Sequence, residues 1–491
     1  MKKIAVTGGG MGGLSAALRL AASGRFKVDL FERSDRVGGK AGTLEHEGFC
    51  FDTGPTLLTM DFVLRDLFAD AGADLESFLP LKKLEANCVY FFADGARFSA
   101  WADEERLCDE ADQVMSDPGS TMKEYLSYCN TIYDLTADLF LFSPFQEMNI
   151  FREFGKKNPF EYLRGMDPFR TMHRANASFF KDARLVQFAD RYATYNGSNP
   201  YKAPATLNII QHVEQAGVYV PEGGIRRIPA AFEKLCRDHG VNIQTGVEVE
   251  QILLKDRCVS GVSVDGEKLD YDAVVSNCDV HRTYERLLGD RWSWGALKYR
   301  WMQPSTSAMV FYWGVKGKSD LSTHTILFPE KYAPEFRALF SKKKCPDDPT
   351  VYIYISCRFS PGDSPEDHEN WYVMINAPAD RGQDWKAETD RMREAIRKRI
   401  STTLGINIES RTVSEKVFTP PDIEEKTASS RGSLYGPSSN GKFSAFLRQS
   451  NRSHRYRGLY FCGGSAHPGG GIPLAALSGK HAADLATEHE S

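Results

Sequence analysis

The chain has 491 residues, 42% of them hydrophobic, with a formal net charge of −4 and a mean hydropathy of −0.40. This length is enough for two or three domains with sizeable cores, and the hydropathy is typical of soluble proteins. The small net charge gives no reason to expect nucleic-acid binding.

Membrane-spanning, secreted and metal-binding classes are also disfavoured. The longest apolar runs, such as residues 308–315, fall well short of the ~18 residues that a spanning helix needs. The first predicted strand begins by Ile4, which leaves no room for a signal peptide. The ten cysteines lie at least twelve residues apart and do not cluster with histidine, which predicts reduced thiols and no metal in a cytoplasmic protein.

The chain begins with a strand–turn–helix–strand unit, predicted over residues 4–6, 7–13, 14–23 and 28–32. Gly8, Gly10 and Gly13 follow the G-x-G-x-x-G spacing of dinucleotide-binding turns. In that pattern the glycines allow a tight turn, close approach of backbone to a pyrophosphate, and close packing of helix on strand. The helix start offers N–H groups and a positive dipole end to the phosphates.

Glu32 ends the second strand nineteen residues after Gly13, close to the ~20 expected for an acid that binds ribose hydroxyls. An acid here disfavours NADP, whose 2′-phosphate it would repel, and leaves NAD and FAD. Residues 33–41 then add a second glycine pair with Lys40, and the run 51–56 follows. This extension resembles flavoproteins of the amine-oxidase and carotenoid-desaturase superfamily. The resemblance implies FAD, with Lys40 beside the phosphates.

The next predicted elements are a helix over 57–71, a hairpin of 89–92 and 97–99, and a helix over 121–138. Composition then changes, because residues 139–180 hold nine of the 30 phenylalanines where even spreading gives about three. Basic residues are interleaved with them, namely Arg152, Lys156, Lys157, Arg164, Arg170 and Arg174. Two compatible interpretations are the aromatic core of a helical subdomain and a lipid-facing patch.

The middle of the chain returns to α/β patterning. Residues 191–201 are rich in Tyr, Thr, Asn and Ser and lead into an apolar helix that ends near Glu214. A run over 272–277 has the character of a parallel strand, so the nucleotide-binding sheet is expected to be interrupted and resumed. Further strands are predicted over 307–315, 350–357 and 371–376, and a helix over 385–404.

The closing motif joins a strand over 458–462 to a glycine turn, the run 467–473, and a helix that continues to about residue 487. Proline has no backbone N–H, but in the first turn of a helix that group would have no intrahelical partner. Pro473 therefore costs no hydrogen bond at the helix start. The helix start carries about half a positive charge, which suits the negative charge that a reduced flavin gathers on its pyrimidine side. The alternative is an ordinary glycine loop that caps a surface helix.

Residues 460–464, 467–473 and 478–480 resemble the C-terminal signature of bacterial-type carotenoid (phytoene) desaturases, and the N-terminal motif agrees, so the resemblance spans the chain. Runs 191–197 and 219–224 look most like carotenoid 3,4-desaturases, which act on 1-hydroxy or 1-methoxy carotenoids.

The resemblance implies an FAD-dependent oxidoreductase of carotenoid biosynthesis in which hydride passes from an acyclic C40 carotenoid to flavin N5. The FAD is expected to be non-covalent, and oxygen or a quinone to reoxidise it. It also implies a cytoplasmic protein held peripherally on the inner face of the cell membrane.

The resemblance further implies an α/β fold with a discontinuous Rossmann-like FAD-binding domain, a substrate domain of mixed sheet and helices, and a helical membrane-associating subdomain. The expected ranges are 1–85, 215–290 and 415–491 for the first, 86–120, 185–214 and 291–414 for the second, and 121–184 for the third.

The residues predicted to bind FAD are Gly8, Gly10, Met11, Gly12, Gly13, Glu32, Arg33, Gly39, Lys40, Gly54, Pro55, Thr56, Val249, Asn277, Gly463, Gly464, Gly471, Ile472 and Pro473. No proton acceptor can be named from the sequence. His467 is the one candidate catalytic residue, and a structural role in holding the glycine loop is the favoured interpretation of it.

Other functions stay open at this stage. A phytoene desaturase or a redox-neutral carotenoid isomerase would use the same scaffold, and product absorbance would separate them. An isoprenoid-binding escort protein of the Rab escort type would bind prenyl chains without flavin, but such proteins lack an intact flavin contact set. An amine oxidase usually flanks the flavin with an aromatic pair, where this chain has Ile472 and Pro473.

Overall fold

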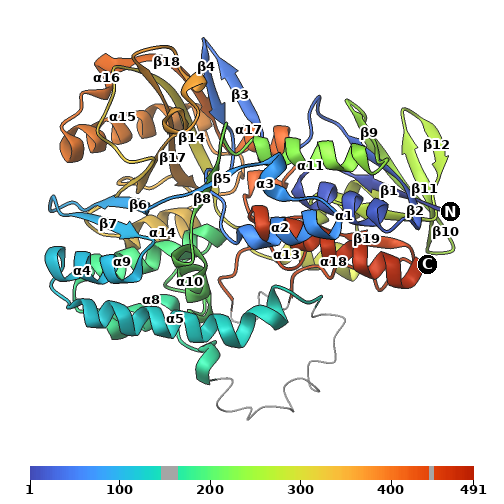
Figure 1. Cartoon of the computed structure of the whole chain (residues 1–491), viewed down its shortest axis with the longest axis horizontal. Helices are drawn as coiled ribbons and strands as arrows, with labels where there is room; N and C mark the ends of the chain where they lie inside the picture. The colour runs from blue at the N-terminus through green and yellow to red at the C-terminus, as the bar shows by residue number, and fades with distance from the viewer. Residues whose placement is uncertain (145–163, 442–446, 491) are drawn as a thin grey trace.

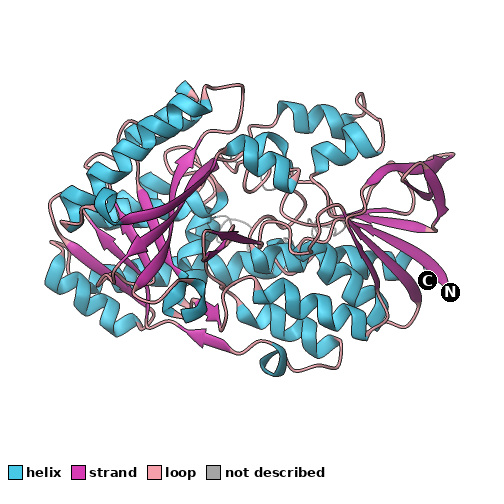
Figure 2. Cartoon of the chain, turned by 90° about the horizontal axis from the view of Figure 1, so that it is seen from above, coloured by secondary structure: helices cyan, strands magenta, loops and turns pink. Residues whose placement is uncertain are grey.

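The computed structural model describes residues 1–144, 164–441 and 447–490. Two large sheets lie in opposite halves of the molecule, each covered by helices, and both termini lie at the outer end of the half that holds the N-terminal strand (Figures 1 and 2). None of the helices in the described ranges combines the length and apolar character needed to cross a bilayer.

The first sheet has five parallel strands in the order β19-β13-β1-β2-β9. Its strands are β1 (Lys2–Thr7), β2 (Phe26–Glu32), β9 (Asn242–Thr245), β13 (Ala273–Ser276) and β19 (Leu459–Phe461). They come from three distant parts of the chain, which confirms that the nucleotide-binding sheet is interrupted and resumed.

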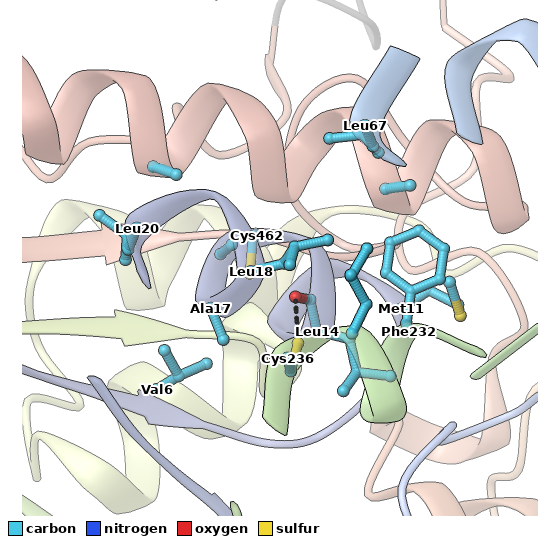
Figure 3. Packing of buried hydrophobic residues seen from close by; sticks show 14 of the residues in the cluster. Val6, Met11, Leu14, Ala17, Leu18, Leu20, Leu67, Phe232, Cys236 and Cys462 are labelled. Carbon is cyan, nitrogen blue, oxygen red and sulfur yellow. Dashed lines mark hydrogen bonds between the residues drawn. The ribbon is translucent and has the colours of Figure 1, made fainter. Parts of the chain in front are cut away.

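Side chains of β1 point alternately to the two faces of this sheet, and other elements cover both faces. Ile4 and Val6 pack with three helices, and Ala5 packs on the opposite face with a small antiparallel sheet. The helices are α1 (Met11–Ala22), α11 (Arg227–Asp238) and α18 (Ile472–Glu490), and the small sheet is β10 (Val249–Lys255), β11 (Cys258–Val264) and β12 (Glu267–Asp270). Figure 3 shows Leu14 of α1 between Val6 and Phe232, with the Cys236 thiol 3.4 Å from the Leu14 carbonyl oxygen.

The second sheet has seven strands in the order β18-β14-β17-β16-β15-β6-β7. All neighbours are antiparallel except β15 and β6. Its strands are β6 (Ala86–Phe91), β7 (Arg97–Trp101), β14 (Ser307–Lys316), β15 (His324–Leu327), β16 (Val351–Ile355), β17 (His368–Ala377) and β18 (Thr412–Phe418). One face packs on α15 (Trp385–Leu404), through Met392, Ile396 and Ile400.

The other face of the seven-stranded sheet packs on a layer of helices. These are α4 (Glu104–Val114), α5 (Gly119–Phe140), α8 (Met172–Phe179), α9 (Ala183–Asp190) and α10 (Ile209–Gln215), with the 3-10 turns η2 (Arg191–Asn196) and η3 (Ala205–Asn208). The smaller elements are β3 (Thr43–His46), β4 (Phe49–Asp52), α2 (Asp61–Asp70), α3 (Leu75–Phe78), β5 (Leu81–Lys83), β8 (Tyr219–Pro221), α12 (Val280–Arg282), α13 (Trp294–Trp301), α14 (Ala333–Arg337), α16 (Ile408–Arg411) and α17 (Pro420–Thr427).

One predicted domain boundary and one predicted subdomain differ from the packing in the structure. The boundary at residue 415 falls inside β18, which is an edge strand of the seven-stranded sheet and therefore belongs with the substrate domain. The segment 121–184 is not a separate subdomain in the part that the structure describes. Met122 and Tyr125 of α5 share one hydrophobic cluster with Tyr312 of the sheet, so helices and sheet form a single core.

The helix predicted over 57–71 is also shorter than expected. Leu58 exchanges two backbone hydrogen bonds with Tyr219, N···O 2.9 and 2.7 Å. Met60 has a φ of +50°, so the helical run α2 begins only at Asp61. The pairing with a distant strand removes the first turn, which the local apolar pattern alone does not indicate.

Candidate functional site

A cavity of about 1680 Å³ lies between the two sheets. One end is formed by the carboxyl ends of β1, β2 and β13, where ligands bind in open parallel sheets. The other end is formed by side chains of β14, β16 and β17 and by the helices α5 and α10. The volume exceeds the roughly 300–1,000 Å³ of typical small-molecule pockets, so it suits a dinucleotide together with a second, long ligand.

The glycine turn between β1 and α1 is held close to its neighbours. Gly8 has a φ of +96°, and a Cβ at Gly13 would lie 2.0 Å from the Gly8 carbonyl oxygen. A Cβ at Gly10 would lie 2.8 Å from Asn277 Nδ2. Gly10 is the N-cap of α1, and no side chain caps the helix start. The turn therefore presents bare backbone and a helix N-terminus, the arrangement that binds phosphates.

Glu32 is buried at the end of β2 and lines the cavity. Its Oε2 accepts a hydrogen bond from Gly9 N (2.7 Å) and its Oε1 accepts one from Ser34 N (2.8 Å). A carboxylate oxygen has more than one acceptor site, so both oxygens can also accept hydrogen bonds from a ligand. Glu32 thus fixes the turn and remains available to a diol.

Lys40, predicted to lie beside the phosphates, lines the cavity and is also held by the protein. Its ammonium donates hydrogen bonds to the carbonyl oxygens of Ser433 (3.2 Å) and Leu434 (2.7 Å). Burial lowers the pKa of Lys40 to about 8. Two of its three N–H donors are therefore used by the protein, and a third remains for a ligand. Nearby, a Cβ at Gly54 would lie 2.0 Å from the Lys40 carbonyl oxygen, which explains the glycine there.

Asn277 joins the first and last motifs of the chain. Its Nδ2 donates to the Gly8 carbonyl oxygen (3.1 Å), while a Cβ at Gly463 would lie 2.5 Å from its Oδ1. The Cys462 thiol lies 3.7 Å from the same Oδ1. Two segments more than 450 residues apart in sequence are thereby held on either side of one amide, the number following from positions 8 and 463.

The predicted cofactor residues converge on this cavity. All of them line the cavity except Gly13. Gly13 lies under the turn against the Gly8 carbonyl oxygen, where it allows the close packing expected of the third glycine. Arg33 lines the cavity and donates from Nη2 to the carbonyl oxygen of Glu425. Val249, at the start of β10, is buried at the rim of the same space.

His467 is held as a structural residue. Its Nε2 lies 2.9 Å from the Ser143 carbonyl oxygen, which only accepts, so this nitrogen carries the proton. Burial lowers the pKa of His467 to about 3. Its own carbonyl oxygen accepts hydrogen bonds from Ser478 Oγ (2.6 Å) and Asn451 Nδ2 (2.8 Å). A neutral imidazole that anchors the glycine loop from both sides is better suited to support than to proton transfer.

The part of the cavity wall formed by η2 and α10 carries two charged residues for which the sequence predicts no role. The sequence places Arg191 in the polar run 191–201 and Glu214 at the end of a predicted helix. Both side chains line the cavity and are buried, with 5% and 2% exposed. No pattern in the sequence distinguishes Glu214 from the other polar residues of this helix, Gln211, His212 and Gln215.

Residues 145–163 of the predicted lipid-facing patch, including Phe151, Phe154 and Phe160, lie outside the described residues. Within the described part, Phe169 is exposed and Phe180 is buried. A different apolar surface is present at the start and end of α13, where Trp292, Trp294 and Trp301 are 80%, 80% and 84% exposed.

Residues 11–487 match the family model "Flavin containing amine oxidoreductase". The chain is 40% identical to a 1-hydroxycarotenoid 3,4-desaturase of Flavobacterium sp. (strain P99-3), with 99% of each chain covered. It is 31% identical to a 4,4′-diaponeurosporene oxygenase of Staphylococcus aureus (strain MRSA252), with 100% of this chain and 99% of the other covered.

Two solved structures share the fold at low sequence identity. A putrescine oxidase matches with a TM-score of 0.65 at 14% identity, with 99% of each chain covered. An oxidoreductase from Methanosarcina mazei matches with a TM-score of 0.64 at 16% identity, covering 97% of this chain and 99% of the other. At these identities the likeness concerns the fold alone.

Proposed function

The chain belongs to the flavin-containing amine oxidoreductases, and from that premise we propose that it desaturates an acyclic C40 carotenoid with FAD. The proposed reaction converts the C3–C4 single bond of a 1-hydroxy or 1-methoxy carotenoid into a double bond. The observation that carries this choice of substrate is the 40% identity, over 99% of both chains, to a protein of that named activity.

The residues of the cavity fit FAD. A Cβ at Gly12 would lie 2.7 Å from both Gly463 N and Asn277 Oδ1, so the turn must stay free of side chains and leaves its backbone to a diphosphate. Glu32 supplies two acceptors for ribose hydroxyls. The start of α18 at Ile472 supplies a positive helix end for the pyrimidine side of a flavin.

When bound, FAD supplies a two-electron acceptor for the hydride that leaves an allylic carbon. The chain itself binds and orients the polyene and excludes water. The walls at the far end of the cavity are largely apolar and aromatic, and include Leu207, Ile209, Ile210, Val213, Tyr312, Tyr352, Tyr372 and Met374. A polyene spreads positive charge along its length, so the proton on the neighbouring carbon needs no strong base.

The FAD is proposed to be non-covalent. Cys462 is the thiol closest to the glycine loop in sequence, but it is buried against Asn277, and burial raises its pKa. A raised pKa disfavours the nucleophilic thiolate. Acid precipitation should release the flavin into the supernatant, and yellow colour retained in the pellet would reject this part of the proposal. Oxygen or a quinone is the proposed acceptor of the electrons.

The substrate partitions into membranes, so the protein is proposed to work from the cytoplasm on the inner face of the cell membrane. Support comes from the exposed tryptophans of α13, because tryptophan favours the boundary between headgroups and hydrocarbon. Residues 291–302 contain Arg291, Lys298 and Arg300 and no acid, which suits anionic headgroups.

The test is to incubate the purified holoenzyme in liposomes with a 1-hydroxy acyclic carotenoid and, separately, with phytoene. A red-shifted product that has lost two hydrogens, formed from the hydroxylated substrate only, supports the proposal. Stepwise desaturation of phytoene would make the protein a phytoene desaturase, and a product of unchanged mass would make it an isomerase. A gain of oxygen would favour the activity named for the staphylococcal relative.

A further inference from the structure

Arg191 carries a buried guanidinium that makes no hydrogen bond or ion pair within the described residues. The side chain is 5% exposed, and its Nε is buried without a partner. The guanidinium carbon lies 5.4 Å from the centre of the Tyr195 ring, and the buried carboxylate of Glu335 acts on the Arg191 charge without a hydrogen bond between them. Burying a charge without hydrogen bonds is strongly unfavourable, so a buried donor normally has a partner, either protein, ordered water or a ligand. Because Arg191 lines the cavity, a ligand there can supply that partner.

Glu214 carries a buried acceptor oxygen without a hydrogen-bond partner. Its Oε1 accepts a hydrogen bond from the Tyr192 hydroxyl (2.9 Å), whereas its Oε2 is buried and has no partner. Burial raises the pKa of Glu214, and the nearby hydroxyls of Tyr195 and Tyr192 and the charge of Arg191 oppose that rise. The Arg191 charge therefore acts on Glu214, and both residues line the same cavity.

The two groups require opposite partners. A guanidinium only donates hydrogen bonds, and a carboxylate only accepts them. A hydroxyl group does both with one oxygen, whereas an ether oxygen accepts but cannot donate, and a hydrocarbon does neither. The neighbouring wall, formed by η3 and α10, carries the apolar side chains of Leu207, Ile209 and Val213 and the hydroxyl of Thr206.

We infer that Arg191 and Glu214 form a binding site for the hydroxyl group at the end of a long apolar substrate, with Arg191 donating a hydrogen bond to the oxygen and Glu214 Oε2 accepting a hydrogen bond from the hydroxyl. The inference rests on the proposed function. Of the two proposed substrate classes, this site favours the 1-hydroxy carotenoids and disfavours the 1-methoxy carotenoids.

The position of this pair suits a hydroxyl close to the reacting bond. Only two carbon–carbon bonds separate C1, which bears the oxygen, from C3, so the hydroxyl site must lie near the glycine loop. Asn196, at the end of the same 3-10 turn as Arg191, accepts from Arg448 Nη2 (3.3 Å), and Arg448 Nη1 donates to the Gly464 carbonyl oxygen (3.0 Å). One arginine thus links the turn of Arg191 to the loop expected at the flavin.

The experiment compares three substrates of matched polyene length in liposomes, bearing a 1-hydroxyl, a 1-methoxyl or no oxygen. For the native holoenzyme, kcat/KM should be roughly 10- to 100-fold higher with the hydroxyl than with either other substrate, the range set by loss of one or two buried hydrogen bonds. Arg191→Met and Glu214→Leu should abolish this preference mainly by lowering kcat/KM for the hydroxylated substrate. Glu214→Gln should retain part of it, because an amide still offers an acceptor.

A binding measurement separates this site from a general effect on activity. The hydroxylated product, which is not turned over, is titrated into the holoenzyme and followed by the shift of its own absorption. Its Kd should rise roughly 10-fold or more in Arg191→Met, while the Kd of the oxygen-free product stays constant. Arg97→Met and Glu105→Leu, which remove exposed charges elsewhere, are the matched controls.

The outcomes distinguish the two levels of the proposal. If no carotenoid is desaturated, the proposed function fails. If all three substrates react equally well and the variants change nothing, the hydroxyl site is wrong while the function stands. Should single variants lose flavin or unfold, the double variant Arg191→Met/Glu214→Met removes both charges together, and it should fold and show no preference for the hydroxyl. A preference that persists in this variant overturns the inference.

Discussion

Among single residues, Glu32 has two functions that one substitution would test together. Glu32→Ala removes the predicted acceptor for ribose hydroxyls and should weaken FAD binding by roughly 1–3 kcal/mol, the scale of hydrogen bonds to a charged group. The same change also removes the partners of Gly9 N and Ser34 N. The FAD dissociation constant, measured by flavin fluorescence, checks the first effect.

Glu32→Gln is the control for this prediction. An amide oxygen still accepts one of the two backbone hydrogen bonds, so the turn should keep its shape better than in the alanine variant. An FAD dissociation constant unchanged by Glu32→Ala would mean that the ribose is held elsewhere.

His467 should make stability depend on pH. Burial lowers its pKa from an ordinary 6.5 to about 3, so between these values the unfolded chain binds a proton that the folded chain does not. The free energy of unfolding therefore falls as the pH drops below about 6.5 and is unaffected above it. Between pH 7 and pH 5, the native protein should lose about 2 kcal/mol more than His467→Gln.

Denaturant unfolding at the two pH values measures this difference. Glutamine keeps a neutral donor for the Ser143 carbonyl oxygen but does not titrate. Equal losses of stability in the two proteins would show that His467 is charged or exposed in the folded state. If His467→Gln retained full desaturase activity, that result would also exclude the histidine as proton acceptor.

Among the elements, the pair α1 and α18 depends on one close approach. A Cβ at Gly479 of α18 would lie 2.2 Å from the Gly12 carbonyl oxygen and 2.8 Å from Ser15 Cβ. Gly479→Ala should therefore push the helices apart, costing about 1–3 kcal/mol of stability and weakening FAD binding, because Gly12 belongs to the predicted phosphate turn. Thermal unfolding with and without added FAD measures both effects.

Gly362→Ala is a suitable comparison for the helix-pair prediction, because nothing lies within 4 Å of its added Cβ. This variant should unfold close to the native temperature. If Gly479→Ala behaved in the same way, the two helices would have more freedom to separate than their contact suggests.

For the whole molecule, the exposed tryptophans predict where it meets lipid. Trp294 and Trp301 lie seven residues apart and so share one face of α13, with Trp292 just before it. Changing all three to Ser should reduce binding to vesicles containing anionic lipid roughly 10-fold or more, because each indole loses its place at the interface. Co-sedimentation measures binding, and a blue shift of tryptophan fluorescence on adding vesicles reports insertion directly.

Val413→Ser removes an apolar side chain that is 52% exposed on β18, away from α13 in sequence, and should leave vesicle binding unchanged. A triple tryptophan variant that still sediments with vesicles would assign membrane contact to another surface, such as the aromatic segment predicted over 139–180. Retention of the flavin spectrum in the variant confirms that the fold is intact.

The sequence by itself determined the elements whose signals are local. Met392, Ile396 and Ile400 recur every four residues, and this spacing predicted α15 at its observed bounds. The apolar face of a helix depends only on residues a few positions apart. The spacing of Gly8, Gly10 and Gly13 predicted the turn because all three lie within six residues: Gly8 supplies a positive φ, and the other two leave room for close neighbours. The family resemblance and the FAD prediction followed from these short motifs.

Only the tertiary structure decided what depends on distant partners. The loss of the first turn before Asp61, the place of β18 in the substrate sheet, and the contacts of Lys40 with the Ser433 and Leu434 carbonyls all come from segments far away in sequence. The presence of Arg191 and Glu214 on the wall of one cavity is of the same kind. Burial, and with it the cost of an unpaired charge, is a property of the packed molecule, and no local pattern of residues contains it.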